Sequence, residues 1–171
     1  AGPPMKQPDE IDISIGSQFA ICGVVAGMLA REGWPVPLAG LAAVAGGGLL
    51  GAVNGGLVAG LGLPAIVVTL ATSVIAREAL RWLTEGVWVQ GLPRGFQWLG
   101  LGQEAGRFAI PILALAVWAA VAWGVRAVAA GRAVYATGSE PEAARLAGIR
   151  PRRVVFAGFV LMGGLVGLAA L

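Results

Sequence analysis

The chain has 171 residues, of which 57% are apolar and only 12% charged, and its formal net charge is +3. Soluble domains carry about 25% charged residues, so this composition excludes an ordinary soluble domain and indicates an all-α bundle of membrane-spanning helices. The basic residues are one lysine and eleven arginines, most of which flank apolar runs. Because no polar domain presents them as one basic face, nucleic acid is not expected as a partner.

Five apolar segments approach or exceed the length of about 20 residues that is needed to cross a bilayer. In chain order they are Ile13–Ala30, Pro37–Leu61, Pro64–Leu83, Phe108–Ala130 and Val154–Leu171. Together they predict a single transmembrane domain over residues 1–171, which begins with a polar, proline-rich segment at residues 1–10. The polar start and the apolar end predict that this domain is a fragment of a longer protein.

The loops between these segments set the predicted orientation. Residues 126–153 contain six arginines and two glutamates, which is typical of a cytoplasmic loop under the positive-inside rule. Residues 84–107 carry two charges of each sign and are bordered by tryptophans, which is typical of an outer interface. We therefore expect residues 131–153 to face the cytoplasm and residues 84–107 to face the opposite side.

Glycines recur at four-residue spacing in several predicted helices. The pairs and the triplet are Gly23/Gly27, Gly47/Gly51/Gly55, Gly56/Gly60 and Gly163/Gly167. This spacing places the glycines on one helix face, where two backbones can approach closely and pack without a hydrophobic driving force. The triplet is the strongest of these signals and predicts a compact bundle.

A short amphipathic helix is predicted over Ser139–Gly148, between the last two apolar segments. Ser139 is expected to cap it and to form a capping box with Glu142, while Pro141 occupies the first turn and Gly148 ends the helix. Its small apolar face consists of Ala143, Leu146 and Ala147. Such a helix at a membrane surface is better suited to docking on a partner protein than to chemistry.

Polar residues inside the apolar segments are candidates for a translocation path: Asp12, Ser14, Asn54, Thr69 and Thr72. Each also has a structural interpretation. Asp12 could cap the first helix, Asn54 could form one interhelical hydrogen bond, and the threonines could bond to their own helix backbone. The structural interpretation is slightly favoured for Asp12 and clearly favoured for Asn54 and the threonines.

Enzymatic activity is not expected from this sequence. The chain has no histidine, its only aspartates are Asp9 and Asp12, and its only lysine is Lys6. It therefore lacks the residues for an intramembrane serine or aspartyl protease and has no Gly-x-x-x-x-Gly-Lys loop for ATP. No catalytic residue, metal ligand or cofactor is predicted.

Three stretches carry a family resemblance. Residues 10–17 (Glu-Ile-Asp-Ile-Ser-Ile-Gly-Ser) are similar to an Ile-Asp-Leu-Ser-Val-Gly-Ser signature, and residues 51–72 to an Asn-Gly…Leu-Pro…Thr-Leu-x-Thr block. Residues 135–150 are similar to a loop that reads Ala-x-Gly-x-Asn-Pro-Glu-Ala-Ala-x-x-x-Gly-Ile. In this order, the three stretches resemble the membrane permeases of bacterial ATP-binding-cassette sugar importers, of the ribose, rhamnose and autoinducer-2 type. The resemblance covers residues 10–171, about the middle half of a typical member.

This resemblance implies a permease subunit in the bacterial inner membrane, with residues 84–107 in the periplasm. It implies three protein partners: a cytoplasmic ABC ATPase, a periplasmic sugar-binding protein and a second permease subunit. Contact with the ATPase is expected at Ser139, Glu140, Glu142, Ala143, Ala144, Arg145 and Gly148. The expected solute is a monosaccharide or a similar polyhydroxylated molecule. A permease of the branched-chain amino-acid type, or a passive channel without an ATPase, remains the alternative.

Overall fold

The computed structural model describes residues 11–87, 89–93, 96 and 103–171. Within these residues every regular element is a helix, so the predicted all-α class is confirmed. The elements are α1 (Ile15–Arg31), α2 (Val36–Gly55), the π-helical turn η1 (Gly56–Gly60), α3 (Ala65–Thr84), α4 (Gln103–Ala127), α5 (Ala129–Ser139), α6 (Pro141–Leu146) and α7 (Pro151–Ala169).

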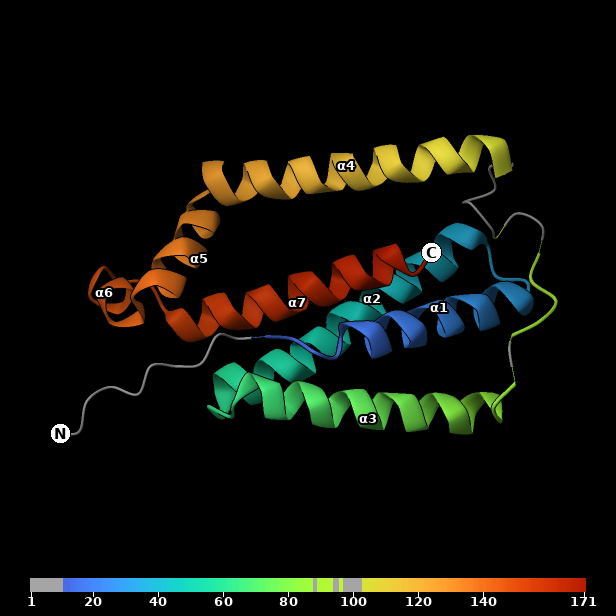
Figure 1. Ribbon diagram of the computed structural model, residues 1–171, viewed down its shortest axis with the longest axis horizontal. Coiled ribbons are helices and arrows are strands. Elements are labelled where there is room, and N and C mark those ends of the chain that lie inside the picture. The colour runs from blue at the N-terminus through green and yellow to red at the C-terminus, as the bar shows by residue number, and fades with distance from the viewer. Residues whose placement is uncertain (1–10, 88, 94–95, 97–102) are drawn as a thin grey trace.

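Four of these helices, α1, α2, α3 and α7, lie side by side as a bundle, and α4 runs along it at a greater distance (Figure 1). The α1–α2 turn, the end of α3 and the start of α4 share one end of the molecule. The α2–α3 junction, α5, α6 and the start of α7 share the other end. The arginine-rich segment therefore lies at the opposite end from the end of α3 and the start of α4, as the predicted orientation requires.

Among the described residues, three helical segments are long and apolar enough to cross a membrane: Val36–Gly60, Glu104–Ala127 and Pro151–Ala169. The first predicted segment forms α1, which is apolar but only 17 residues long. The third forms α3, a helix of 20 residues that carries Arg77, Glu78 and Arg81 in its second half. The five predicted segments thus correspond to five helices, of which three meet the length and hydropathy expected of a membrane span.

Proline marks where several helices begin. Pro35 and Pro64 directly precede α2 and α3, and Pro141 and Pro151 occupy the first turns of α6 and α7. Proline suits these positions because its fixed φ angle fits a helix start, where its missing N–H would have no intrahelical partner.

The fourth predicted segment ends earlier than expected. Helix α4 stops at Ala127, Val128 adopts an extended conformation, and α5 follows inside the predicted loop 131–153. Gly131 makes this corner possible, because a Cβ at this position would overlap the backbone of Val125. Most of the predicted cytoplasmic loop is consequently helical, in α5 and α6.

The most extensive contact in the bundle joins α2 to α7. Gly47 and Gly51 of α2 face Gly163 and Phe159 of α7, and a Cβ on either of these α2 glycines would overlap a carbonyl oxygen of α7. Gly163 and Gly167 present the same close approach from the α7 side. The predicted glycine face is confirmed, and we refer to this α2–α7 contact as the glycine seam.

The other glycine pairs do not form such contacts. A Cβ at Gly56 or Gly60 would meet no atom within 4 Å, so the prediction of close packing there was wrong. These two residues bound η1, which packs against α7 and α3 through other residues, with Val58 buried beside Phe159. A Cβ at Gly23 or Gly27 would reach its nearest atom at 3.4 Å, which is an ordinary contact distance.

Candidate functional site

Helix α1 begins inside the bundle, beside α2 and α3 (Figure 1). The lead-in to this helix is fixed by Asp12, whose Oδ1 accepts the Ser14 backbone N–H at 2.8 Å and the Ser14 hydroxyl at 2.5 Å. A short polar side chain that bonds the backbone two residues later forms a local turn. Asp12 therefore has a structural role, but it orders the lead-in and does not cap the helix, whose N-cap is Ser14 without a side-chain cap bond.

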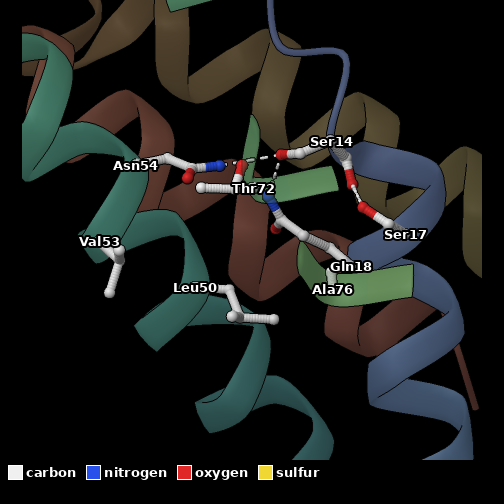
Figure 2. A pocket seen from close by; sticks show the side chains of 8 residues that line it. All are labelled: Ser14, Ser17, Gln18, Leu50, Val53, Asn54, Thr72 and Ala76. Carbon is white, nitrogen blue, oxygen red and sulfur yellow. Dashed lines mark hydrogen bonds between the residues drawn. The ribbon is translucent and has the colours of Figure 1, made fainter. Parts of the chain in front are cut away.

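Ser14 connects two helices through its side chain. Its Oγ accepts a hydrogen bond from Gln18 Nε2 at 2.6 Å and another from Asn54 Nδ2 at 2.9 Å (Figure 2). Ser14, Gln18 and Asn54 are 1%, 3% and 2% exposed. The predicted interhelical hydrogen bond of Asn54 is confirmed, and its partner is Ser14. We call the group formed by Asp12, Ser14, Gln18 and Asn54 the polar junction.

The directions of these bonds follow from the Asp12 carboxylate. An ionised carboxylate only accepts hydrogen bonds, so the single hydroxyl hydrogen of Ser14 points at Asp12. The two lone pairs of Ser14 Oγ then accept from the two amides, whose NH₂ groups must face Ser14. One carboxylate thus orients three buried polar side chains.

The hydroxyls of α3 bond to their own helix, as the structural interpretation predicted. Thr72 donates to the Thr69 carbonyl at 3.2 Å, and Ser73 donates to the Leu70 carbonyl at 2.8 Å. Thr69 is fully buried, and its Oγ1 also accepts the backbone N–H of Ile13 at 3.2 Å. Thr69 therefore helps to hold the lead-in of α1 against α3.

A small cavity of about 40 Å³ adjoins the polar junction. Its lining residues are Ser14, Ser17, Gln18, Leu50, Val53, Asn54, Thr72 and Ala76 (Figure 2). Ser14, Asn54 and Thr72 were predicted path residues, whereas Gln18 was missed. The four-residue spacing of Ser14 and Gln18, which places both on one helix face, was the signal available in the sequence.

Asp12 lines a different and larger space. A groove of about 890 Å³ runs past the start of α1, η1, the α4–α5 corner and the first half of α7. Asp12, Thr137 and Arg152 are among its polar lining residues, and Val58, Phe159 and Met162 among its apolar ones. The predicted path residues are thus divided: Ser14, Asn54 and Thr72 border the cavity, Asp12 borders the groove, and Thr69 borders neither.

The structure corrects the predicted start of the short helix. Ser139 is the last residue of α5, Glu140 is extended, and α6 begins at Pro141 without a side-chain cap. The predicted capping box was wrong. Ser139 belongs to α5, so the N-cap position of α6 falls on Glu140 and the Ser139 hydroxyl does not cap α6. Pro141 occupies the predicted first turn. Gly148 follows the helix with φ +83°, and its N–H bonds to the Arg145 carbonyl at 3.0 Å.

Helix α6 presents most of its side chains outward. Ala144 is 3% exposed and packs against the protein, whereas Leu146 is 89% exposed. Ala143 and Ala147 are exposed as well, so the predicted apolar face is free of contacts within the described chain. Glu142 and Arg145 form an exposed ion pair of 3.9 Å, which leaves one charge of each sign beside Leu146.

The part of the chain that the structure describes contains no group of three or more His, Cys, Asp or Glu side chains that could hold a metal ion. The polar junction combines one carboxylate with neutral hydroxyls and amides, and α6 leaves Leu146 exposed at its surface.

Comparison with known proteins identifies the family to which the chain is similar. The family model described as "Branched-chain amino acid transport system / permease component" matches residues 8–171. The autoinducer 2 import system permease proteins LsrC of Salmonella typhimurium and Salmonella typhi are each 38% identical to this chain over 161 residues, which is 94% of the chain and 46% of the relative. LsrC of Escherichia coli K12 is also 38% identical over 161 residues, with 47% of its length covered.

The chain spans about half the length of these curated relatives. No solved structure gives a significant match. The family match covers nearly the whole chain, including the polar junction and α6. The chain belongs to the family of branched-chain amino acid transport system permease components.

Proposed function

We propose that this chain is the central part of a permease subunit in an ATP-driven importer of a small polyhydroxylated solute, a monosaccharide or a molecule like autoinducer 2. In this proposal α6 docks on a separate cytoplasmic ATPase, and the bundle provides the path. The observation that carries the proposal is the position of α6, which stands at the arginine-rich end of the bundle with Leu146 unprotected.

The geometry of α6 supports a docking role. Ala144 anchors the helix to the protein, while Leu146 and the Glu142–Arg145 pair project away from it. An apolar side chain surrounded by charges of both signs matches the usual plan of an interface, with an apolar centre and a polar rim. Ser139, Glu140 and Gly148 flank this surface and are exposed.

The connection of α6 to both neighbouring helices supports transmission of movement. Helix α6 is separated from α5 by one residue and contacts both α5 and α7. Helix α7 in turn packs along α2 through the glycine seam, and α2 carries Asn54. A displacement of α6 therefore has a continuous packed route to the polar junction.

The polar junction supports a neutral, hydroxyl-bearing solute. Its side chains are neutral amides and hydroxyls, the groups that exchange hydrogen bonds with sugar hydroxyls, and its one carboxylate is already bonded to Ser14. A branched-chain amino acid would instead require an apolar pocket and partners for two charges. The curated relatives named for autoinducer 2 import favour the same solute class.

The partners follow from this proposal. The ATPase binds at α6, a second permease subunit completes the membrane unit, and a periplasmic binding protein delivers the solute. The family and the three span-forming helices place the chain itself in the bacterial inner membrane, in contact with lipid. A passive channel would have no use for an exposed docking helix, and it is the competing function that the experiment must exclude.

The test uses the full-length protein, expressed with a candidate ABC ATPase subunit of the same organism. Leu146→Glu places a charge at the centre of the proposed interface, and we expect at least a tenfold loss of co-purified ATPase, because interface centres carry most of the binding energy. Tyr135→Glu is the matched control: Tyr135 is exposed on α5 at the same end, outside the proposed interface. This variant should retain the ATPase.

Transport completes the test in proteoliposomes that contain the permease, its ATPase and its binding protein. Uptake of D-ribose or autoinducer 2 should require ATP and should fall with Leu146→Glu. Uptake that proceeds without ATP would establish a passive channel. ATP-dependent uptake of L-leucine, with no uptake of either hydroxylated solute, would assign the chain to amino-acid transport.

A further inference from the structure

The cavity beside the polar junction contains one hydrogen-bond acceptor that the protein does not use. Gln18 is 3% exposed, and its Oε1 is buried without a hydrogen-bond partner among the described residues. Its Nε2 donates a hydrogen bond to Ser14 Oγ, so only the oxygen of the amide lacks a partner. Most buried side-chain polar atoms have a partner, and a solitary one calls for a specific explanation.

Reversing the Gln18 amide does not remove the vacant position. Ser14 gives its only hydroxyl hydrogen to Asp12, so Ser14 Oγ can only accept from Gln18. The NH₂ group must therefore face Ser14, and Oε1 must be the end that is left over. The vacancy is a consequence of the carboxylate at position 12.

The hydroxyls around the cavity cannot supply the missing donor either. Ser17 donates to the Ser14 carbonyl at 2.8 Å, and Thr72 donates to the Thr69 carbonyl at 3.2 Å. The remaining wall is largely apolar, with Leu50, Val53 and Ala76. No hydroxyl of the described wall is free to donate to Gln18 Oε1, which points to a molecule inside the cavity as the donor.

The size of the cavity restricts that molecule. A single water needs about 10–15 Å³ of accessible volume, and this cavity offers about 40 Å³. Typical small-molecule sites begin near 300 Å³, so a whole sugar does not fit in the described arrangement. One water does fit, and so does a single hydroxyl group of a solute that lies mostly outside the cavity.

We propose that this cavity is a binding site for one O–H donor, held by Gln18 Oε1 at the start of α1. The donor is either a resident water or a hydroxyl group of the transported solute, which have the same hydrogen-bonding chemistry. The solute alternative rests on the proposed function, whereas the water alternative does not. In both cases Gln18 is the residue that selects a donor and rejects an apolar group of the same size.

The test is a cryo-EM structure of the full-length protein in lipid nanodiscs, at a resolution that shows ordered water. Without solute, we expect density within about 2.5–3.2 Å of Gln18 Oε1. Thr72→Val is the matched control, because it removes a wall hydroxyl whose hydrogen is already used, and it should keep the density. Gln18→Met has a similar length but only a weak thioether acceptor in place of the amide oxygen, and the density should be lost.

Ala76→Val provides a second variant if Gln18→Met does not fold, since it leaves Gln18 intact and narrows the cavity. We expect it to lose the density too. An empty cavity in the wild type, or density that remains in Gln18→Met, would overturn the proposal. These outcomes do not depend on ATP or on the ATPase, so they are separate from a failure of the proposed function.

A second structure with saturating D-ribose distinguishes the two sources. Density that remains a single isolated peak assigns the site to water. A ribose hydroxyl in the same position, continuous with the rest of the sugar, assigns the site to the solute. A ribose molecule bound in the bundle while Gln18 Oε1 stays without any donor would contradict both sources.

Discussion

Two contacts hold α2 in the bundle, and they differ in kind. The glycine seam joins α2 to α7 through backbone atoms, with Gly47 and Gly51 against Gly163 and Phe159. The polar junction joins α2 to α1 through side chains, with Asn54 bonded to Ser14. The seam depends on the absence of side-chain atoms, whereas the junction depends on the exact placement of a few polar ones.

The two contacts give α2 one rigid side and one side that can rearrange. A seam of close backbone contacts is rigid, because any added carbon overlaps a neighbouring carbonyl. Hydrogen bonds inside a membrane protein contribute only about 0.6 kcal/mol on average, so the junction can be rearranged at lower cost. The comparison indicates that the α2–α7 pair is the fixed frame and that α1 is the element that can shift against it.

The largest expected effect is at the seam. Gly51→Ala places a Cβ against the Phe159 carbonyl oxygen, and we expect it to lower the free energy of unfolding by about 3 kcal/mol, because two backbones must separate. Unfolding in mixed micelles under increasing SDS measures this value. Gly48→Ala is the control on the same helix, since its Cβ meets no atom within 4 Å. Similar stability of the two variants would show that the seam is not tightly packed.

The junction should respond more moderately. Ser14→Ala removes the acceptor shared by Gln18 and Asn54, and we expect a loss of about 2 kcal/mol, because two buried amide donors are left without a partner. Ser17→Ala is the control in the same unfolding assay: its hydroxyl bonds only to the carbonyl of Ser14 on its own helix. A cost for Ser17→Ala equal to that of Ser14→Ala would contradict the central position of Ser14.

The smallest effect isolates the contact between α1 and α2. A double-mutant cycle with Ser14→Ala and Asn54→Leu should give a coupling energy of about 0.6–1.7 kcal/mol, between the average and the maximum for interhelical hydrogen bonds in membranes. Strictly additive effects of the two substitutions would mean that the 2.9 Å bond contributes no stability. In that case the glycine seam would be the only one of the two contacts that stabilises the position of α2.

Much of this architecture was predictable from local patterns. Hydropathy located the five main helices to within a few residues at most ends, because each must present apolar side chains over a bilayer length. The four-residue glycine repeat identified the face of α2 that contacts α7, since helical periodicity alone places those residues together. The arginine distribution predicted which loops share an end of the molecule, and the arrangement in Figure 1 agrees.

Other features depended on where the chain turns between helices. The end of α4 at Ala127 could not be predicted from hydropathy, because the break requires Gly131 to pack against Val125 after the chain turns. The capping box at Ser139 failed for the same kind of reason, since α5 extends through that residue.

The composition and periodicity of the chain therefore determined that it is a membrane-embedded helical bundle, because apolar burial in lipid is a property of each segment by itself. Only the tertiary structure decided that Asp12 orients Ser14, that Ser14 faces Asn54 forty residues away, and that Gln18 is left with a vacant acceptor. Hydrogen bonds are short and directional, so their pairing is fixed only when the helices that carry them have packed.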